Sequence, residues 1–209
     1  MTSDAAYSQS ARASAPIYGQ KVGEALALAA GLHATQRRKG KDEPYLSHIL
    51  MVASLVAHYG GDEDQIVAAA LHDAVEDQGG ESLAVEIGAR FGQRVELIVR
   101  DCSDSHVDKG AEKPPWRERK ERYLARLQEP DIHGSRLVEA CDKLANLRDI
   151  VEDLSAVDKS TLDRFSGGRD GVQWYYSELM RLLIVNFPAM AAEYSRLLAL
   201  LNDFADDYA

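Results

Sequence analysis

A run of six apolar residues that leads into a histidine and three carboxylates constrains this chain more than any other segment. Residues 66–71 read Ile-Val-Ala-Ala-Ala-Leu, and residues 72–77 continue as His-Asp-Ala-Val-Glu-Asp. If the segment is helical, its four ionisable side chains form two i,i+4 pairs and crowd onto roughly one face. Such a density of charge beside a buried run is costly unless a cation neutralises it. The segment therefore predicts a helix that contributes to a divalent-metal site.

Helical patterning extends along the rest of the chain and predicts an all-α fold. Apolar residues recur at helical spacing, whereas no alternating pattern with turn signals at hairpin spacing occurs. A length of 209 residues suits one domain with a substantial core. We expect a disordered segment over residues 1–16 and a single helical bundle over residues 17–209. The predicted helices lie near residues 17–38, 45–59, 63–78, 81–89, 92–102, 115–128, 132–153, 171–186 and 188–206.

Two side chains do not hold a metal ion, so other helices must supply further ligands. His48 opens a segment with helical apolar spacing, which places it in the first turn of a helix. Asp142 lies on a second strongly patterned helix, beside its buried stripe. Together with His72 and Asp73, these residues make a set of nitrogen and oxygen ligands that suits Mn, Fe or Zn.

Four sequence blocks in this order resemble the HD phosphohydrolase superfamily, and within it the small alarmone hydrolases of the Rel/Spo group. The resemblance extends over roughly residues 20–185. It implies an HD-domain helical bundle that hydrolyses the 3′-diphosphate of guanosine or adenosine alarmones such as ppGpp, giving a nucleoside 5′-phosphate and pyrophosphate. The blocks are residues 36–48 (Gln-Arg-Arg-Lys, then Pro-Tyr-Leu-Ser-His), 69–77 (Ala-Ala-Leu-His-Asp-Ala-Val-Glu-Asp), 113–120 (Lys-Pro-Pro-Trp-Arg-Glu-Arg-Lys) and 141–149 (Cys-Asp-Lys-Leu-Ala-Asn-Leu-Arg-Asp).

The same resemblance implies roles for individual residues. One Mn²⁺ ion would be bound by His48, His72, Asp73 and Asp142, and its bound water would be activated near neutral pH. Glu76 and Asp77 would orient or deprotonate that water. The implied substrate-binding residues, among which a guanidinium can stack on a purine, are Arg38, Lys39, Asn146, Lys113, Arg169 and Tyr175.

Plainer interpretations of these residues stay open. The basic run over residues 37–41 is also typical of a solvated loop. Glu76 and Asp77 also suit a solvated helix end, because Gly79 and Gly80 follow as a stop signal. The connection over residues 99–116 is not a close copy of the best-known hydrolases, which leaves the base and the number of phosphates undecided. Two other functions therefore stay open: an HD-type phosphohydrolase of another nucleotide, and a non-catalytic nucleotide-sensing module.

Net charge, apolar content and cysteine usage limit which kinds of partner and which cell compartment we expect. A formal net charge of −10 disfavours nucleic-acid binding, although a small nucleotide needs only a local basic pocket and a cation. No apolar run approaches the length that spans a bilayer, and residues 1–16 lack the apolar core of a secretory signal. Cys102 and Cys141 have no CxxC partner, which indicates a reducing compartment. We expect a cytoplasmic protein whose partner is a small nucleotide rather than nucleic acid or membrane; a homo-oligomer stays open. Because the chain ends at Ala209, we do not expect an alarmone synthetase domain.

Overall fold

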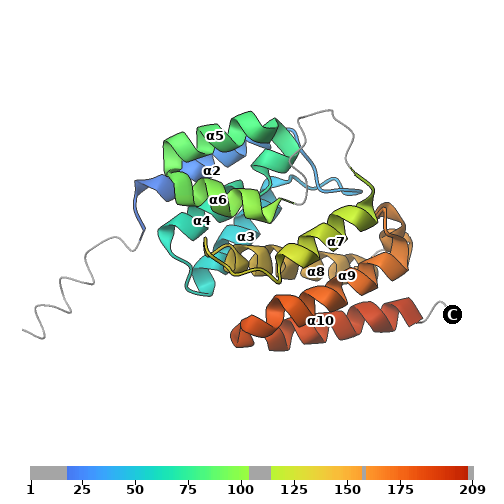
Figure 1. The fold of residues 1–209 in the computed structure, drawn as a ribbon. Helices are drawn as coiled ribbons and strands as arrows, with labels where there is room; N and C mark the ends of the chain where they lie inside the picture. The colour runs from blue at the N-terminus through green and yellow to red at the C-terminus, as the bar shows by residue number, and fades with distance from the viewer. Residues whose placement is uncertain (1–17, 104–113, 157–158, 207–209) are drawn as a thin grey trace, which may run out of the picture.

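The computed structural model describes residues 18–103, 114–156 and 159–206, and most of them are helical (Figure 1). Within these ranges there is no β-strand, and the isolated β-bridge joins Arg37 to Pro44. The predicted all-α class is therefore confirmed. The helices are α2 (Gln20–Leu32), α3 (Leu46–His58), α4 (Glu63–Leu71), η1 (Val75–Gly79), α5 (Gly80–Phe91), α6 (Gln93–Cys102), α7 (Trp116–Arg126), α8 (Arg136–Ala156), η2 (Lys159–Arg164), α9 (Gly168–Leu182), η3 (Ile184–Asn186) and α10 (Pro188–Asp206).

Helices α4 and α8 lie at the centre of the bundle. Helix α4 packs against α2, α3 and α6, while α8 packs against α3, α6 and α10 (Figure 1). All six apolar residues of the run 66–71 are buried, so α4 has no solvated face along this run. A helix that is apolar on every side is stable only inside a protein, which explains its central place.

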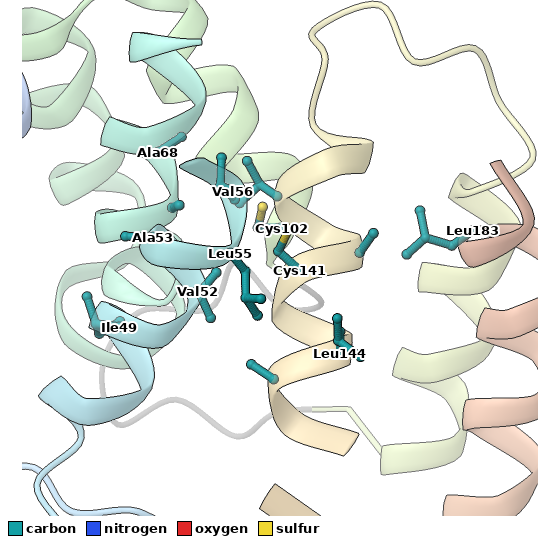
Figure 2. Close-up of a cluster of buried hydrophobic side chains, with 14 of the residues drawn as sticks. Ile49, Val52, Ala53, Leu55, Val56, Ala68, Cys102, Cys141, Leu144 and Leu183 are labelled. Atoms are coloured by element: carbon teal, nitrogen blue, oxygen red, sulfur yellow. The ribbon is translucent and has the colours of Figure 1, made fainter. Parts of the chain in front are cut away.

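The core between α3 and α8 fixes these two helices relative to each other. Val52 and Val56 of α3 and Cys141 and Leu144 of α8 are buried in one cluster, and Figure 2 shows Leu55 and Cys141 where the two helices face each other. Burying each large aliphatic side chain is worth about 1.5–3 kcal/mol. Because His48 begins α3 and Asp142 lies on α8, this packing also sets the distance between two predicted ligands.

The first predicted helix was too long, because residues 36–45 form a tight loop instead of continuing it. Helix α2 ends at Leu32. The backbone N–H of Arg38 donates to the carbonyl of Glu43 at 2.9 Å, and that of Tyr45 donates to the carbonyl of Gln36 at 2.9 Å. Gly40, at the tip, has φ of 76°, a conformation that glycine adopts without steric cost. The loop reverses the direction of the chain and places the basic run, residues 37–41, beside α8.

The predicted continuous helix over residues 63–78 is also interrupted. Helix α4 ends at Leu71, and a π-helical turn, η1, follows at Val75–Gly79. The backbone N–H of Asp77 still donates to the carbonyl of Asp73 at 3.0 Å, which keeps these residues one turn apart. Single π-turns within helical segments are frequent at functional sites, because the wider turn displaces side chains from the α-helical register.

The other predicted helices differ from the observed ones by about one turn or less at their ends, a usual uncertainty for helix boundaries. Across the described ranges, no helix has both the length and the apolarity that a membrane crossing requires.

Candidate active site

The four predicted metal ligands converge where the start of α3, the end of α4 and the middle of α8 come together. Nε2 of His48 lies 3.3 Å from Nε2 of His72 and 3.2 Å from Oδ1 of Asp142. Oδ2 of Asp73 lies 2.9 Å from Nε2 of His72 and 3.6 Å from Nε2 of His48. Nε2 of His72 lies 3.6 Å from Oδ1 of Asp142. We call these four residues the ligand quartet.

The hydrogen bonding of His72 shows that the quartet fits a cation. Its Nδ1 lies 2.8 Å from the carbonyl oxygen of Ala69, and a carbonyl only accepts hydrogen bonds. Nδ1 therefore carries a proton, so Nε2 is the atom that would bind a metal ion in place of a proton. One atom each of His48, His72 and Asp73 lies within 4.8 Å of the others, and Oδ1 of Asp142 lies 3.2 Å from Nε2 of His48; such donor atoms repel one another unless positive charge lies among them. A divalent ion suits this donor set.

Electrostatics keep the carboxylates of the quartet ionised. Burial raises the pKa of Asp142, but the Lys143 ammonium and the two histidines outweigh burial and hold that pKa well below its usual range. The pKa of Asp73 is likewise depressed, because the neighbouring histidines outweigh its burial. Burial lowers the pKa of His72, yet the two carboxylates outweigh it and raise that pKa well above its usual value. Both carboxylates are thus in the form that binds metal.

Neighbouring side chains fix the orientation of the ligands. The hydroxyl of Tyr45 donates to Oδ2 of Asp73 at 2.6 Å. Burial and the charges of Asp73 and Asp77 raise the pKa of Tyr45, so the hydroxyl keeps its proton and stays a donor. On the other side, Asp142 accepts hydrogen bonds from Nζ of Lys143 at 2.5 Å and from Nδ2 of Asn146 at 2.6 Å. Such partners orient metal ligands and tune their affinity.

Glu76 and Asp77 line a small polar cavity of about 230 Å³ beside the quartet, which we name the phosphate cavity after the substrate group expected from the sequence. Nε2 of Gln36 donates to Oδ2 of Asp77 at 2.8 Å, and Oε1 of Glu76 lies 4.0 Å from Nη1 of Arg119. Both carboxylates belong to the π-helical turn that follows the ligands. The full lining is Tyr45, Asp73, Glu76, Asp77, Cys102, Trp116, Arg119, Lys120, Asp142, Lys143 and Asn146.

A second cavity of about 380 Å³, here called the nucleoside cavity, adjoins the first. The residues that line both are Tyr45, Asp77, Trp116, Lys120, Lys143 and Asn146. Four of the predicted substrate-binding residues line the nucleoside cavity: Arg38, Lys39, Asn146 and Tyr175. Because its volume suits a small organic ligand, it adds a binding pocket to the charged centre.

The guanidinium of Arg38 is held in place within the nucleoside cavity. Its Nη2 donates to Oδ1 of Asn146 at 3.0 Å and to Oδ2 of Asp149 at 2.9 Å. Its Cζ lies 5.6 Å from the centre of the Tyr45 ring. Lys41 also pairs with Asp149 and lies 2.7 Å from Asp153, so the basic run is anchored to α8. The loop is therefore not merely solvated, since two of its cations are paired with one helix.

Two predicted substrate-binding residues are not placed in these cavities. Arg169 lines neither of them, although it lies in the first turn of α9. Lys113 lies outside the described residues.

Some cavity residues were not singled out from the sequence. Tyr45 and Lys143 stand three residues before His48 and directly after Asp142, so proximity to a ligand was a usable signal. Gln36, which holds Asp77, lies 41 residues from it, and its contact has no local signal. Arg164 from η2 also lines the nucleoside cavity, and only the tertiary fold brings it there.

Comparison with known proteins places the chain in a family. The sequence profile described as the HD domain matches residues 25–173. The chain belongs to the HD-domain family, in agreement with the predicted resemblance.

Similarity to particular proteins narrows the class within this family. The chain is 40% identical over 130 residues to guanosine-3′,5′-bis(diphosphate) 3′-pyrophosphohydrolase MESH1 of Xenopus tropicalis, covering 61% of this chain and 68% of that protein. The human protein of the same name is 38% identical over 130 residues, with the same coverage of 61% and 68%.

Two solved structures share the fold. One was described as a metazoan ortholog of SpoT that hydrolyses ppGpp; it is 27% identical with a TM-score of 0.70, covering 88% of this chain and 97% of that chain. The other is lmo0812 from Listeria monocytogenes, 30% identical with a TM-score of 0.60, covering 77% of this chain and 99% of that chain.

Proposed function

We propose that this protein is a metal-dependent 3′-pyrophosphohydrolase of guanosine 3′,5′-bis(diphosphate). The single observation that carries the proposal is the ligand quartet, whose Asp73 and Asp142 line a phosphate cavity that shares a wall with a nucleoside cavity. The names of the MESH1 relatives support the same substrate. A nucleotide with a 3′-diphosphate suits these two adjoining cavities, because its base requires an apolar or aromatic surface and its phosphates require cations.

The proposed reaction is the attack of water on the phosphorus attached to the ribose 3′ oxygen. The bond between that phosphorus and the 3′ oxygen breaks, a proton is transferred to the 3′ oxygen, and ppGpp with one water gives GDP and pyrophosphate. When bound by the quartet, a divalent ion supplies Lewis acidity that makes a nucleophilic water available near neutral pH. We propose Mn²⁺ as this ion, and the mixed nitrogen and oxygen donors of the quartet support that choice.

Protein residues provide the remaining functions. Glu76 and Asp77 line the phosphate cavity beside the quartet, where they would orient the water and accept its proton. Gln36 keeps Asp77 in one orientation through its 2.8 Å hydrogen bond. The cationic side chains of Arg119, Lys120 and Lys143 line the same cavity and would bind the 3′-diphosphate.

The nucleoside cavity would hold the base and ribose. Arg38 is fixed by Asp149 and Asn146, so its plane is pre-organised to stack on a purine without further ordering. Lys39 and Tyr175 line the same cavity, where they would contact the base or the ribose. Asn146 lines both cavities, which suits a contact with the ribose between base and 3′-diphosphate. A cytoplasmic location is supported by the buried cysteines Cys102 and Cys141, which are free thiols.

The decisive experiment is incubation of the purified protein with ppGpp, ppApp and pGpp, each with Mn²⁺ or with EDTA, followed by identification of the products. We expect pyrophosphate and GDP from ppGpp with Mn²⁺ and no turnover with EDTA. The ppApp and pGpp arms determine the base preference and the required phosphate number. A matched control is Asp101→Asn, which changes a carboxylate paired with His133 outside both cavities and should keep full activity.

Three outcomes would contradict the proposal. Orthophosphate in place of pyrophosphate would identify another HD-type phosphohydrolase. Binding of ppGpp without turnover at any metal would identify a nucleotide-sensing module. Equal rates with and without the chelator would reject the metal-dependent mechanism.

A further inference from the structure

Trp116, the first residue of α7, lies at the junction of three cavities. It lines the nucleoside cavity, the phosphate cavity and a third cavity that the first residues of α7 and α9 form. The tryptophan ring is only partly buried, so part of it stays accessible from these spaces. A ligand that covers the accessible part of this indole would gain hydrophobic free energy from burying its apolar surface.

The backbone of the α9 start holds the ring of Trp116 in place. A Cβ atom at Gly167 would lie 2.6 Å from Cη2 and Cζ3 of the indole, and one at Gly171 would lie 3.0 Å from Cζ3. The six-membered edge of the ring therefore packs directly on a surface that exists only because both positions are glycine. Edge-to-face contacts with Trp174 and Tyr175, with centroids 6.2 Å away in each case, complete this seat. The ring is thus pre-organised, which reduces the entropy lost when a ligand stacks on it.

The neighbours of Trp116 indicate which part of a ligand it contacts. Cationic side chains line both cavities, but the phosphate cavity adds carboxylates beside the quartet, whereas the nucleoside cavity adds apolar and aromatic residues including Ile150, Phe165 and Val172. Trp116 belongs to both linings, so it stands between the site of the base and that of the 3′-diphosphate. An aromatic face at this point suits a nucleoside, because sugar C–H groups and purine faces both pack on an indole.

We propose that Trp116 contacts the nucleoside of the substrate and is a specificity-determining residue of this enzyme. The proposal rests on the proposed function, which supplies the nucleotide. It also assigns a role to Gly167 and Gly171: they set the position of the indole ring.

Steady-state kinetics with ppGpp test the proposal through matched variants. Trp116→Ala should raise KM about tenfold with little change in kcat, as expected for the loss of one stacking contact. Trp116→Phe should restore most of the loss because it keeps an aromatic face. Asp170→Asn is the control: Asp170 lies in the first turn of α9 and lines only the third cavity, so the KM of this variant should stay within about twofold of wild type.

Gly167→Ala moves the ring without removing it. Gly167 has φ of −83°, which alanine adopts without strain, so the main effect is the clash between its Cβ and the indole. We expect KM to rise in the same direction as in Trp116→Ala, by a smaller factor. Equal KM values for Trp116→Ala and Asp170→Asn would overturn the proposal.

Fluorescence separates this proposal from the proposed function. The chain contains two tryptophans, so Trp174→Phe leaves Trp116 as the single indole fluorophore. In EDTA, we expect GMP to change the emission of Trp116 by more than pyrophosphate does, because only GMP carries a nucleoside and both ligands can enter the phosphate cavity that Trp116 lines. Unchanged emission at saturating GMP would contradict the contact. If wild-type protein does not hydrolyse ppGpp, the proposed function fails, while the GMP titration still tests Trp116.

Discussion

The phosphate cavity and the nucleoside cavity share a wall but are built in different ways. The quartet beside the phosphate cavity comes from α3, the end of α4 and α8, whose buried faces pack tightly on one another. The nucleoside cavity is lined by the loop over residues 36–45 and by side chains of α7, α8, η2 and α9. Chemistry is thus placed on the most rigid part of the fold, where small displacements are expensive. The nucleoside cavity instead combines helix faces with the loop over residues 36–45, and such loops tolerate change more readily than packed helices.

The largest effect on activity is expected from substitution of a residue of the ligand quartet. Asp73→Asn keeps the shape of a quartet ligand but removes its charge, so bound metal and activity should both be lost. Because activation of water by a metal lowers its pKa by about eight units, we expect activity to fall by more than about a thousandfold. Metal content and ppGpp hydrolysis are measured on the same sample, with thermal unfolding to verify the fold. Wild-type activity in the variant would exclude Asp73 as a ligand.

Glu76→Gln is expected to have the next largest effect. The amide retains most of the size of the side chain but cannot accept a proton, so kcat should fall by about 10²–10⁴-fold with KM nearly unchanged. Stopped assays over a range of ppGpp concentrations separate the two constants. The mechanism is wrong if the variant keeps its kcat while still binding ppGpp.

Tyr45→Phe tests the support of the ligands. Loss of the 2.6 Å hydrogen bond to Asp73 should weaken metal affinity by about 10–100-fold, as is typical for partners of metal ligands. Activity is titrated against free Mn²⁺, and high Mn²⁺ should restore most of it. Tyr59→Phe, at the other end of α3, provides the control and should titrate like wild type.

The smallest effect is expected from substitution of Asp149, which lines the nucleoside cavity. Burial raises the pKa of Asp149, but hydrogen bonds from Lys41 and Arg38 outweigh it and lower that pKa below its usual value. A depressed pKa stabilises the fold at pH above the unfolded value of about 3.9, and this contribution is lost as pH falls through the folded pKa. Asp149→Asn should therefore reduce the free energy of unfolding at pH 7 by about 2 kcal/mol.

Chemical denaturation over a pH series measures this effect. The stability curves of wild type and Asp149→Asn should converge as pH falls below about 4. The same variant frees Arg38, so KM for ppGpp should rise while kcat changes little. A variant with lower kcat and unchanged KM would instead connect Asp149 to the chemical step and break the distinction between the two cavities.

Much of the quartet could be predicted because each ligand stands in a local pattern. The apolar run over residues 66–71 indicated a buried helix, and the periodicity after His48 and around Asp142 fixed which sides of two further helices are buried. A polar residue that borders the buried face of a helix lies close to the space where that helix packs on its neighbours. Two boundaries were predicted wrongly, after Leu32 and after Leu71, because helical patterning does not register a loop stabilised by distant contacts or a π-turn.

The sequence by itself thus determined the helical class, the buried helix faces and the residues of the quartet. Only the tertiary structure decided how the nucleoside cavity is assembled: Arg38 bonds to Asp149 across 111 residues, and Trp116 rests on Gly167 and Gly171 of another helix. The physical reason is one of range. The apolar spacing that defines a helix and its buried face extends over a few residues, so a local sequence pattern reveals it. Hydrogen bonds and ring packing between distant segments depend on where the folded chain places each segment.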